Sequence, residues 1–355
     1  MSHSDGKIIP SPFIRGLSPY KTSAAESGSV LKLDTNEGPY PSKSLIDELV
    51  SEGVDVIRSY PDIHELESLL AGMLGIDPSR LIVTAGADDA LERSIRSVLS
   101  PGKELILPVP TFEMLERFAT LAGADIREVE WTQASYPLDA VLNAVTDSTA
   151  MICVVTPNNP TGLTATAEDV ETLSMKLPGV MILVDLAYTE FADEDMSLRV
   201  LELPNVIITR TLSKAWGLAG LRVGYAAGSE RYIRWLRAAG QPYPVSTPSA
   251  RLASRALRTG VESMRLFCDR VRKERHTLIQ LLKKAGVKVL PSGGNFVFAR
   301  FDNAGKVRSS LRDRGILVRI FPGQKYLEDS MRISLPGNED DFTRLTRALE
   351  DILSI

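Results

Sequence analysis

The chain has 355 residues, of which 44% are apolar and 24% are charged, and its formal net charge is −4. This is the composition of an ordinary globular protein of about two domains, and so small a net charge argues against a basic surface for nucleic acid. Two cysteines and three histidines are too few for a disulfide framework, a zinc site or a histidine-based catalytic centre, so we expect no metal.

The N-terminal residues lack the apolar region of a secretory signal peptide. The longest apolar runs, such as residues 180–184, are too short to cross a bilayer. We therefore expect a cytoplasmic protein without a membrane partner. Residues 1–40 contain prolines at positions 10, 12, 19 and 39, and we expect them to form an N-terminal arm rather than part of the core.

Residues 41–245 alternate between segments with helical spacing and short β-rich runs. Short apolar runs separated by helices are typical of buried parallel strands with helices on both faces of the sheet. We therefore predict an α/β domain, the larger of the two. Its strands are expected at residues 80–86, 103–109, 150–156, 180–185 and 205–210.

Residues 246–355 have a different pattern and predict a smaller α+β C-terminal domain. A long charged stretch over residues 249–286 predicts helix with one break at Gly260. A final helix is predicted to begin near Asn338. Between them lie strand-like pieces at residues 287–290, 295–301, 315–320 and 331–335.

Polar residues and turns follow the predicted strands of the larger domain. Because ligands bind beyond the carboxyl ends of strands in an open α/β sheet, these residues should meet at one edge. Taken singly, each has an ordinary structural explanation as a turn, a helix N-cap or a surface side chain. As a set they predict a binding site, built from the segments 85–88, 110–112, 156–162, 185–188 and 211–222.

At these residues the chain resembles the fold-type I enzymes that use pyridoxal 5′-phosphate (PLP), and specifically the aminotransferases that include histidinol-phosphate aminotransferase. The resemblance extends from about Tyr20 to the C-terminal helix. It implies the aspartate aminotransferase-like fold, with a mostly parallel sheet in the large domain. The motifs that carry it are TLSKAWGLAGLRVG (211–224), TPNNPTG (156–162), DLAY (185–188) and SYPD (59–62).

The resemblance implies roles around the ring of PLP, which acts as an electron sink. Lys214 would form the Schiff base and carry the proton, and Asp185 would face the pyridine nitrogen. Tyr188 and Asn159 would hydrogen-bond to the phenolic oxygen of the ring. Phe112 would stack on the ring, where relatives more often have tyrosine.

The resemblance also implies a site for the cofactor's phosphate and an active site shared between subunits. Tyr60 would reach the phosphate from a neighbouring subunit, which implies a homodimer. The remaining phosphate contacts would come from a helix N-terminus, two hydroxyls and a guanidinium. They are Ala87, Asp88, Thr211, Ser213 and Arg222.

Substrate binding would involve Arg332, Arg319 and Tyr20, with Asn36 in the segment that lines the pocket mouth in relatives. Two arginines and a tyrosine suit a phosphate dianion better than a single carboxylate. We therefore expect a histidinol-phosphate:2-oxoglutarate aminotransferase of histidine biosynthesis, with an amino donor and a keto acid as its small-molecule partners.

Other activities remain open at this point. An aromatic or other amino-acid aminotransferase, or a phospho-amino-acid decarboxylase of the same fold, would use the same cofactor residues. A regulatory protein without turnover is disfavoured because the chain has no additional DNA-binding segment. A nucleotide-binding protein is disfavoured because neither a dinucleotide-binding nor a Walker glycine motif is present.

Overall fold

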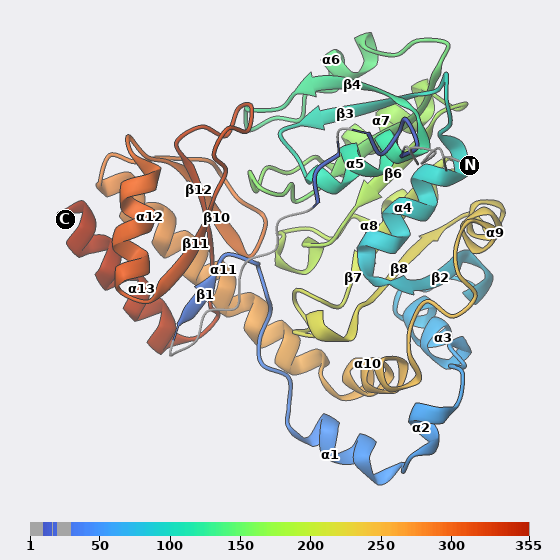
Figure 1. The fold of residues 1–355 in the computed structure, drawn as a ribbon, viewed down its shortest axis with the longest axis horizontal. Helices are drawn as coiled ribbons and strands as arrows, with labels where there is room; N and C mark the ends of the chain where they lie inside the picture. Colours follow the sequence, from blue (N-terminus) through green and yellow to red (C-terminus); the bar gives the residue numbers. More distant parts are fainter. Residues whose placement is uncertain (1–9, 16, 20–29, 355) are drawn as a thin grey trace, which may run out of the picture.

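Two β-sheets organise the chain in the computed structural model, which describes residues 10–15, 17–19 and 30–354 (Figure 1). The larger sheet has seven strands and the smaller has five. The larger sheet belongs to the middle of the chain, and the smaller is built mainly from residues near the C-terminus. This is the mostly parallel α/β architecture with a smaller second sheet that the sequence predicts.

Six strands of the larger sheet point in one direction, and β8 alone runs opposite to both of its neighbours. The five predicted runs form β2, β3, β5, β6 and β7, whereas β4 and β8 lie outside every predicted run. In spatial order the strands are β2 (Leu81–Ala85), β8 (Val223–Gly228), β7 (Val206–Thr211), β6 (Met181–Asp185), β5 (Thr149–Val155), β3 (Glu104–Val109) and β4 (Asp125–Glu130).

Helices cover both faces of this sheet because its central strands are apolar on both faces. In β5, Met151 and Cys153 join one buried cluster, and the alternate residues Ile152 and Val154 join the other. The first cluster packs under α4 (Gly86–Val98), α5 (Glu113–Ala122) and α9 (Glu230–Ala239). The second packs under α3 (His64–Met73), α7 (Ala167–Lys176), α10 (Thr247–Thr259) and α11 (Val261–Lys284).

The smaller sheet contains a strand from the segment expected to be an arm. Leu31–Leu33 forms β1 and pairs in parallel with β11, and Leu33 is only 2% exposed. The expectation that residues 1–40 stay outside the core is therefore wrong for this stretch. The order is β1, β11 (Ile316–Ile320), β12 (Ser330–Ser334), β10 (Phe296–Arg300) and β9 (Lys288–Val289), with α12 (Ala304–Asp313) and α13 (Glu339–Leu353) beside it.

Two predicted helix boundaries are confirmed. The long charged stretch breaks at Gly260, between α10 and α11. The Asn338 side chain accepts a hydrogen bond from the Asp341 amide and begins α13, which is the geometry of an N-cap. None of the helices in the described ranges combines the length and apolar character that a membrane crossing requires.

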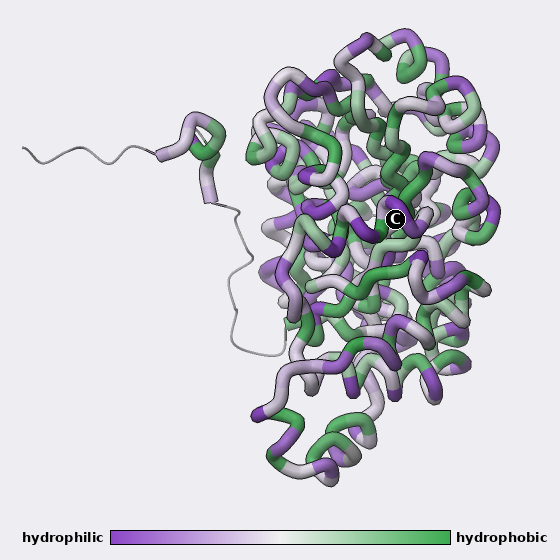
Figure 2. The backbone as a smooth tube through the Cα atoms, turned by 90° about the vertical axis from the view of Figure 1, so that its right-hand side faces the viewer, coloured by the Kyte–Doolittle hydropathy of each residue, from purple (hydrophilic) through white to green (hydrophobic). Residues whose placement is uncertain are grey.

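The remaining short elements lie in connections. The loop with α1 (Ser44–Ser51) and α2 (Asp55–Arg58) projects from the lower end of the molecule and carries hydrophobic residues (Figure 2). Helix α10 packs against α1 and α3 and so connects this loop to the rest of the molecule. The others are α6 (Leu138–Asn143), α8 (Ser197–Val200) and three 3₁₀ turns at Pro78–Arg80, Thr189–Phe191 and Ala219–Leu221.

The segment that follows β1 crosses directly over the loop that carries Lys214. A Cβ placed on Gly38 would come within 1.7 Å of the Lys214 carbonyl oxygen. A Cβ placed on Gly217 would come within 2.0 Å of the Pro39 carbonyl oxygen. Both obstacles are backbone atoms, so only glycine allows the two segments to lie this close.

We predict that Gly38→Ala destabilises the protein by about 3 kcal/mol, because one of the two crossing backbones must move. The measurement is the free energy of unfolding in urea. Gly72→Ala is the matched control, because no atom lies within 4 Å of a Cβ at this position. It should stabilise helix α3 by up to about 1 kcal/mol. Equal effects of the two variants would contradict the crossing as a constraint.

Candidate active site

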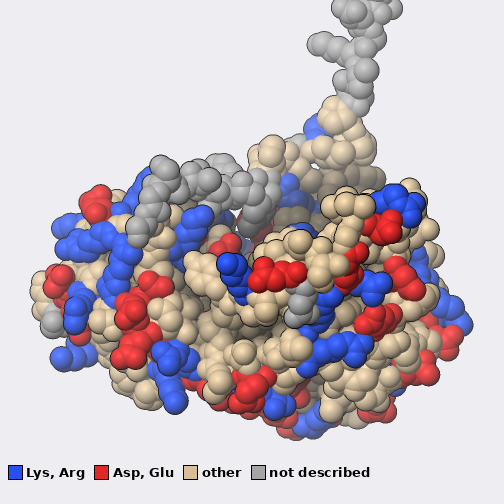
Figure 3. Space-filling model, turned by 90° about the horizontal axis from the view of Figure 1, so that it is seen from below, with Lys and Arg blue, Asp and Glu red and all other residues tan. Residues whose placement is uncertain are grey.

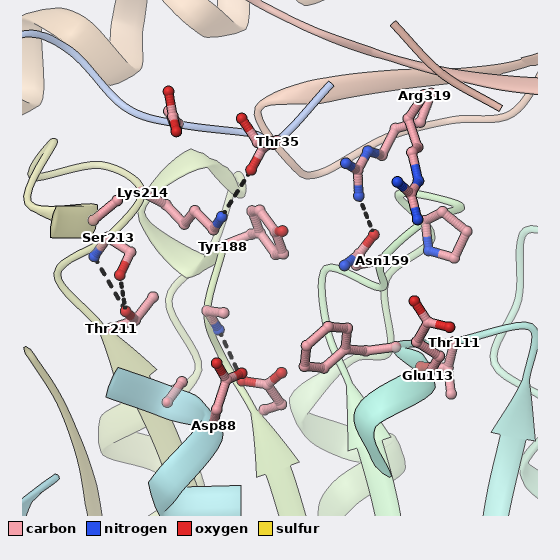
Figure 4. A pocket seen from close by; sticks show the side chains of 18 of the residues that line it. Thr35, Asp88, Thr111, Glu113, Asn159, Tyr188, Thr211, Ser213, Lys214 and Arg319 are labelled. Carbon is pink, nitrogen blue, oxygen red and sulfur yellow. Dashed lines mark hydrogen bonds between the residues drawn. The ribbon is translucent and has the colours of Figure 1, made fainter. Parts of the chain in front are cut away.

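A cavity of about 350 Å³ lies between the carboxyl ends of the larger sheet's strands and the smaller sheet (Figure 4). Twelve of the residues predicted from the sequence line it. The structure thus brings together positions up to 245 residues apart in the chain. The twelve are Ala87, Asp88, Phe112, Asn159, Asp185, Tyr188, Thr211, Ser213, Lys214, Arg222, Arg319 and Arg332.

Three predicted site residues are not among those lining the cavity. Tyr20 lies outside the described residues. Tyr60 is 79% exposed on the projecting loop and stacks on Tyr243, with ring centroids 4.5 Å apart. Asn36 is buried behind the wall, where its Nδ2 donates to the Tyr188 hydroxyl at 3.1 Å and its Oδ1 accepts from Ser334.

Lys214 extends into the cavity from the loop after β7. Its Nζ donates to the Thr35 carbonyl oxygen at 3.2 Å and lies 5.8 Å from the centre of the Tyr188 ring. The Tyr188 hydroxyl already accepts a hydrogen bond from Asn36, so its own proton is left for an acceptor in the cavity. A primary amine and a phenol donor therefore lie beside each other.

Asp185 forms the floor of the cavity at the end of β6 and is only 5% exposed. Its Oδ1 accepts hydrogen bonds from the Thr209 hydroxyl at 3.0 Å and the Ala187 amide at 3.2 Å. Burial outweighs these hydrogen bonds and raises the pKa of Asp185 to about 6. A buried carboxylate of this kind is suited to a cationic or N–H-donating ligand.

The start of helix α4 offers a place for an anion. Gly86 has φ +76°, and a Cβ there would meet the Arg222 guanidinium at 2.7 Å, so glycine allows that side chain to lie across the helix end. Arg222 pairs with Asp88 at 3.1 Å, and both side chains are about half exposed. The Thr211 and Ser213 hydroxyls lie 2.9 Å apart on the same side. Helix dipole, guanidinium and hydroxyls together favour a phosphate.

Two arginines reach the cavity from the smaller sheet, and their surroundings differ. Arg332 is 7% exposed and donates to Asn159 Oδ1 at 2.6 Å and to the Asp34 carbonyl at 2.5 Å. The Arg319 side chain makes no hydrogen bond or ion pair among the described residues, and its guanidinium lies 6.0 Å from the Phe321 ring. Arg319 is therefore a cation available to an anionic ligand.

Sequence reasoning missed several lining residues. Thr35 contributes only a backbone carbonyl, which no side-chain pattern can reveal. Glu113, the first residue of α5, lines the cavity, and its side chain makes no hydrogen bond or ion pair among the described residues. Its position directly after Phe112 was the available signal. Others missed include Glu37, Phe321 and Gln324.

The described part of the chain contains no cluster of three or more histidine, cysteine, aspartate or glutamate side chains that could hold a metal ion. The functional groups gathered at the cavity are instead an amine, a buried carboxylate, a phenol and guanidinium groups. This set can hold an anionic ligand at two ends and transfer protons between them.

We predict that Asp185→Asn stabilises the chain freed of ligand, and more so at higher pH. A carboxyl whose pKa is raised on folding binds more protons in the folded state, so it loses stability as the pH rises from about 4 to above about 6. The asparagine avoids this loss, which amounts to at most about 3 kcal/mol. Urea unfolding should show a larger gain near pH 8 than near pH 5. A loss of stability at both pH values would contradict the assignment.

Comparison with known proteins places the chain among relatives of similar length. It is 34% identical over 334 residues to a histidinol-phosphate aminotransferase from Caldanaerobacter subterraneus, covering 91% of this chain and 93% of that protein. An aromatic amino acid aminotransferase from Cutibacterium acnes is 30% identical over 345 residues, covering 95% and 96% of the two chains.

A solved structure shares the fold, and a family model agrees with this grouping. The histidinol-phosphate aminotransferase from Sinorhizobium meliloti, solved in complex with pyridoxal-5′-phosphate, superimposes with a TM-score of 0.85 at 24% identity and covers 99% of both chains. The family model described as aminotransferase class I and II matches residues 29–349. This match spans both sheets and every described residue of the cavity. The chain therefore belongs to the class I and II aminotransferase family.

Proposed function

We propose that this aminotransferase interconverts imidazole-acetol phosphate plus glutamate and histidinol phosphate plus 2-oxoglutarate, with PLP as its cofactor. When bound, PLP supplies an electron sink for the negative charge that develops at the substrate's Cα. The observation that carries the substrate assignment is Arg319, a guanidinium that has no hydrogen-bond or ion-pair partner among the described residues and lies in the same cavity as Arg332.

The residues of the cavity fit PLP. Asp185 is buried, and its raised pKa favours a ligand that brings a proton or a positive charge, such as a pyridinium nitrogen. The glycine at the start of α4 lets the Arg222 guanidinium lie across the helix end, where it and the first amides of the helix would bind the phosphate. Phe112 lines the cavity and offers an aromatic face to the ring. These three features match the pyridine nitrogen, the phosphate and the ring face of PLP.

Each side chain then has a defined task. Lys214 would hold the cofactor through its amine, and the same amine, once free, would take the proton from the substrate's Cα. With PLP bound, the Tyr188 hydroxyl, which accepts from Asn36, would donate to the phenolic oxygen, and Asn159 Nδ2 would donate there too because Asn159 Oδ1 accepts from Arg332. The arginines of the smaller sheet bind the anionic end of the substrate.

Recognition of the substrate's ring would involve the wall of the cavity that lies across from Arg319. Glu113 belongs to the larger sheet's side of the cavity and Arg319 to the smaller sheet's side (Figure 4). A substrate with a phosphate at one end and an imidazole N–H at the other could bind both groups. A phenyl ring offers no hydrogen for the Glu113 carboxylate, which favours an imidazole substrate over phenylalanine.

We predict that Lys214→Ala abolishes covalent binding of PLP and all turnover. The measurement is the yellow absorbance of the purified enzyme and its loss on borohydride treatment. In the wild type, histidinol phosphate and glutamate should each bleach that absorbance. Preference for phenylalanine would favour the aromatic aminotransferase, and release of carbon dioxide from a phosphorylated amino acid would favour the decarboxylase.

Arg319→Ala separates the substrate classes within the same experiment. Loss of one charge-assisted hydrogen bond should raise KM for histidinol phosphate by roughly ten- to hundredfold, with a smaller effect on phenylalanine. Arg308→Ala is the control. Arg308 is exposed on α12, the helix beside the smaller sheet, and it does not line the cavity. Equal losses for both substrates would contradict phosphate recognition by Arg319.

We also propose that the enzyme is a homodimer whose subunits meet at the projecting loop. Large apolar side chains are exposed along α1, α2 and their flanks, and an exposed apolar patch of this kind marks an interaction surface. Acidic and basic side chains are interspersed around the face seen from below, which leaves no strong field of one sign to oppose pairing (Figure 3). The exposed residues are Tyr40, Ile46, Val50, Val54, Ile57, Tyr60 and Tyr243.

We predict that Ile57→Asp yields monomers with little activity, whereas Met175→Asp, at a similarly exposed methionine on α7, leaves the dimer intact. Sedimentation measures the mass.

If Tyr60 serves the neighbouring site, mixed dimers of Lys214→Ala and Tyr60→Phe regain one complete site. Activity should then rise on mixing, and no gain would contradict a shared site.

Two further expectations belong to this proposal. Residues 41–245 and 246–355 would act as a large and a small domain, with β1 added to the sheet of the small one and α10 packed against the large one. Groups from both sheets line the cavity, so a change in their distance would open or close it. A cytoplasmic location agrees with Cys153 and Cys268, which are both buried and unpaired.

A further inference from the structure

Behind the cavity, the segment that carries Tyr188 is held by a buried arginine from the strand that leads to Lys214. Arg210 lies in β7, and its side chain is 10% exposed. Its Nη2 donates to Glu190 Oε1 at 2.9 Å and its Nη1 to Asp195 Oδ2 at 3.0 Å. One guanidinium therefore binds two carboxylates that follow Tyr188 in the chain.

The ion pairs are mutually stabilising. Burial alone would raise the pKa of Asp195, but the charge of Arg210 and the hydrogen bonds from Ser197 outweigh it and lower the pKa. Burial likewise opposes the charge on Arg210, yet Tyr225 of the neighbouring strand β8, together with Glu190 and Asp195, raises its pKa above the ordinary value. Removing Arg210 would leave Glu190, itself 10% exposed, as an uncompensated acid.

The position of Arg210 in the strand separates it from the ligand. Thr209 donates to Asp185, and Thr211 lines the cavity, so the residues on either side of Arg210 face the cofactor site. Successive side chains of a strand point to opposite faces, and Arg210 does not line the cavity. It can therefore influence the chemistry only through the segments it joins.

The far side of the Tyr188 segment is anchored independently, by α11. Arg272 donates to the carbonyl oxygens of Glu190 and Ala192, at 2.6 and 3.3 Å. Arg275 donates to the Phe191 carbonyl at 3.0 Å and to the Gly294 carbonyl at 2.9 Å. Because these backbone contacts would remain, loss of Arg210 should let the segment shift relative to β7 without unfolding it.

We propose that Arg210 is a positioning residue for the transamination: its ion pairs with Glu190 and Asp195 set the distance between the Tyr188 hydroxyl and Lys214. The inference rests on the proposed PLP chemistry but not on the identity of the substrate. Tyr188 can stabilise the deprotonated form of the lysine-bound cofactor only while its hydroxyl stays within hydrogen-bonding distance of the phenolic oxygen.

The test compares Arg210→Met and Arg210→Lys in the PLP-loaded enzyme. The readout is the pH midpoint of the visible absorbance change. Arg210→Met should raise this midpoint, as we also expect of Tyr188→Phe, and lower kcat by roughly ten- to hundredfold with a smaller change in KM. Arg210→Lys, which keeps the charge but loses the fork that binds two acids, should restore part of both effects.

A double variant distinguishes positioning from general damage. If Arg210 acts through Tyr188, Arg210→Met should cause no further shift of the midpoint in a Tyr188→Phe background. Fully additive shifts, or a lower melting temperature with an unchanged midpoint, would overturn the proposal. Hydrogen exchange of residues 186–196 in the chain without cofactor gives a second readout, and it should quicken in Arg210→Met.

Further variants keep the test decisive if Arg210→Met folds poorly, and control for the loss of any two-pronged ion pair. Glu190→Gln and Asp195→Asn each remove one ion pair and should each shift the midpoint by less than Arg210→Met does. Arg199→Met is the matched control, since Arg199 also forms a two-pronged ion pair, with Glu171, but on the exposed surface. It should leave the midpoint unchanged. If Lys214→Ala still bound PLP covalently, the proposed function itself would fail, whatever the Arg210 variants showed.

Discussion

The crossing of residues 34–39 over the Lys214 loop is the contact on which the site depends. Gly38 and Gly217 allow the two backbones to touch, and the Thr35 carbonyl then accepts from Lys214 while the Asp34 carbonyl accepts from Arg332. The same segment continues from β1, so one end is joined to a strand of the smaller sheet and the other end contacts the Lys214 loop. The smaller sheet is thereby held where its arginines face the strand ends of the larger one.

Charges in the site are arranged for a ligand at the expense of the chain's own stability. Asp185 is buried with a raised pKa, and Arg319 has no acidic partner among the described residues. The Arg222–Asp88 pair is half exposed and contributes little to folding. Behind the cavity, by contrast, Arg210 is matched by Glu190 and Asp195. Asp185 and Arg319 form no ion pair among the described residues, as expected where ligand binding supplies the missing interactions.

Much of the fold could be predicted because buried strands and capped helices have local signals. Five apolar runs became five strands, and Asn338 and Gly260 marked helix boundaries. The strands that were missed lack those signals. The edge strand β4 is mostly polar and exposed, β8 is rich in glycine and alanine, and β1 has only three residues. Their pairing comes from neighbouring strands, which no local pattern records.

From the sequence alone, the family motifs predicted which side chains gather at the cavity. Asp185, Tyr188 and Lys214 lie at or just after strand ends, and parallel strands bring such ends to one edge. Arg319 and Arg332 instead come from within strands of the smaller sheet. Only the tertiary structure decided how those groups are used. In the structure, Asn36 lies behind the cavity and donates to Tyr188. Arg332 is hydrogen-bonded to Asn159, whereas the Arg319 side chain is available to a ligand. Glu113 and the Thr35 carbonyl also belong to the cavity. The reason is physical, because hydrogen-bond partners and burial depend on contacts between residues hundreds of positions apart, whereas motifs depend on neighbours in the chain.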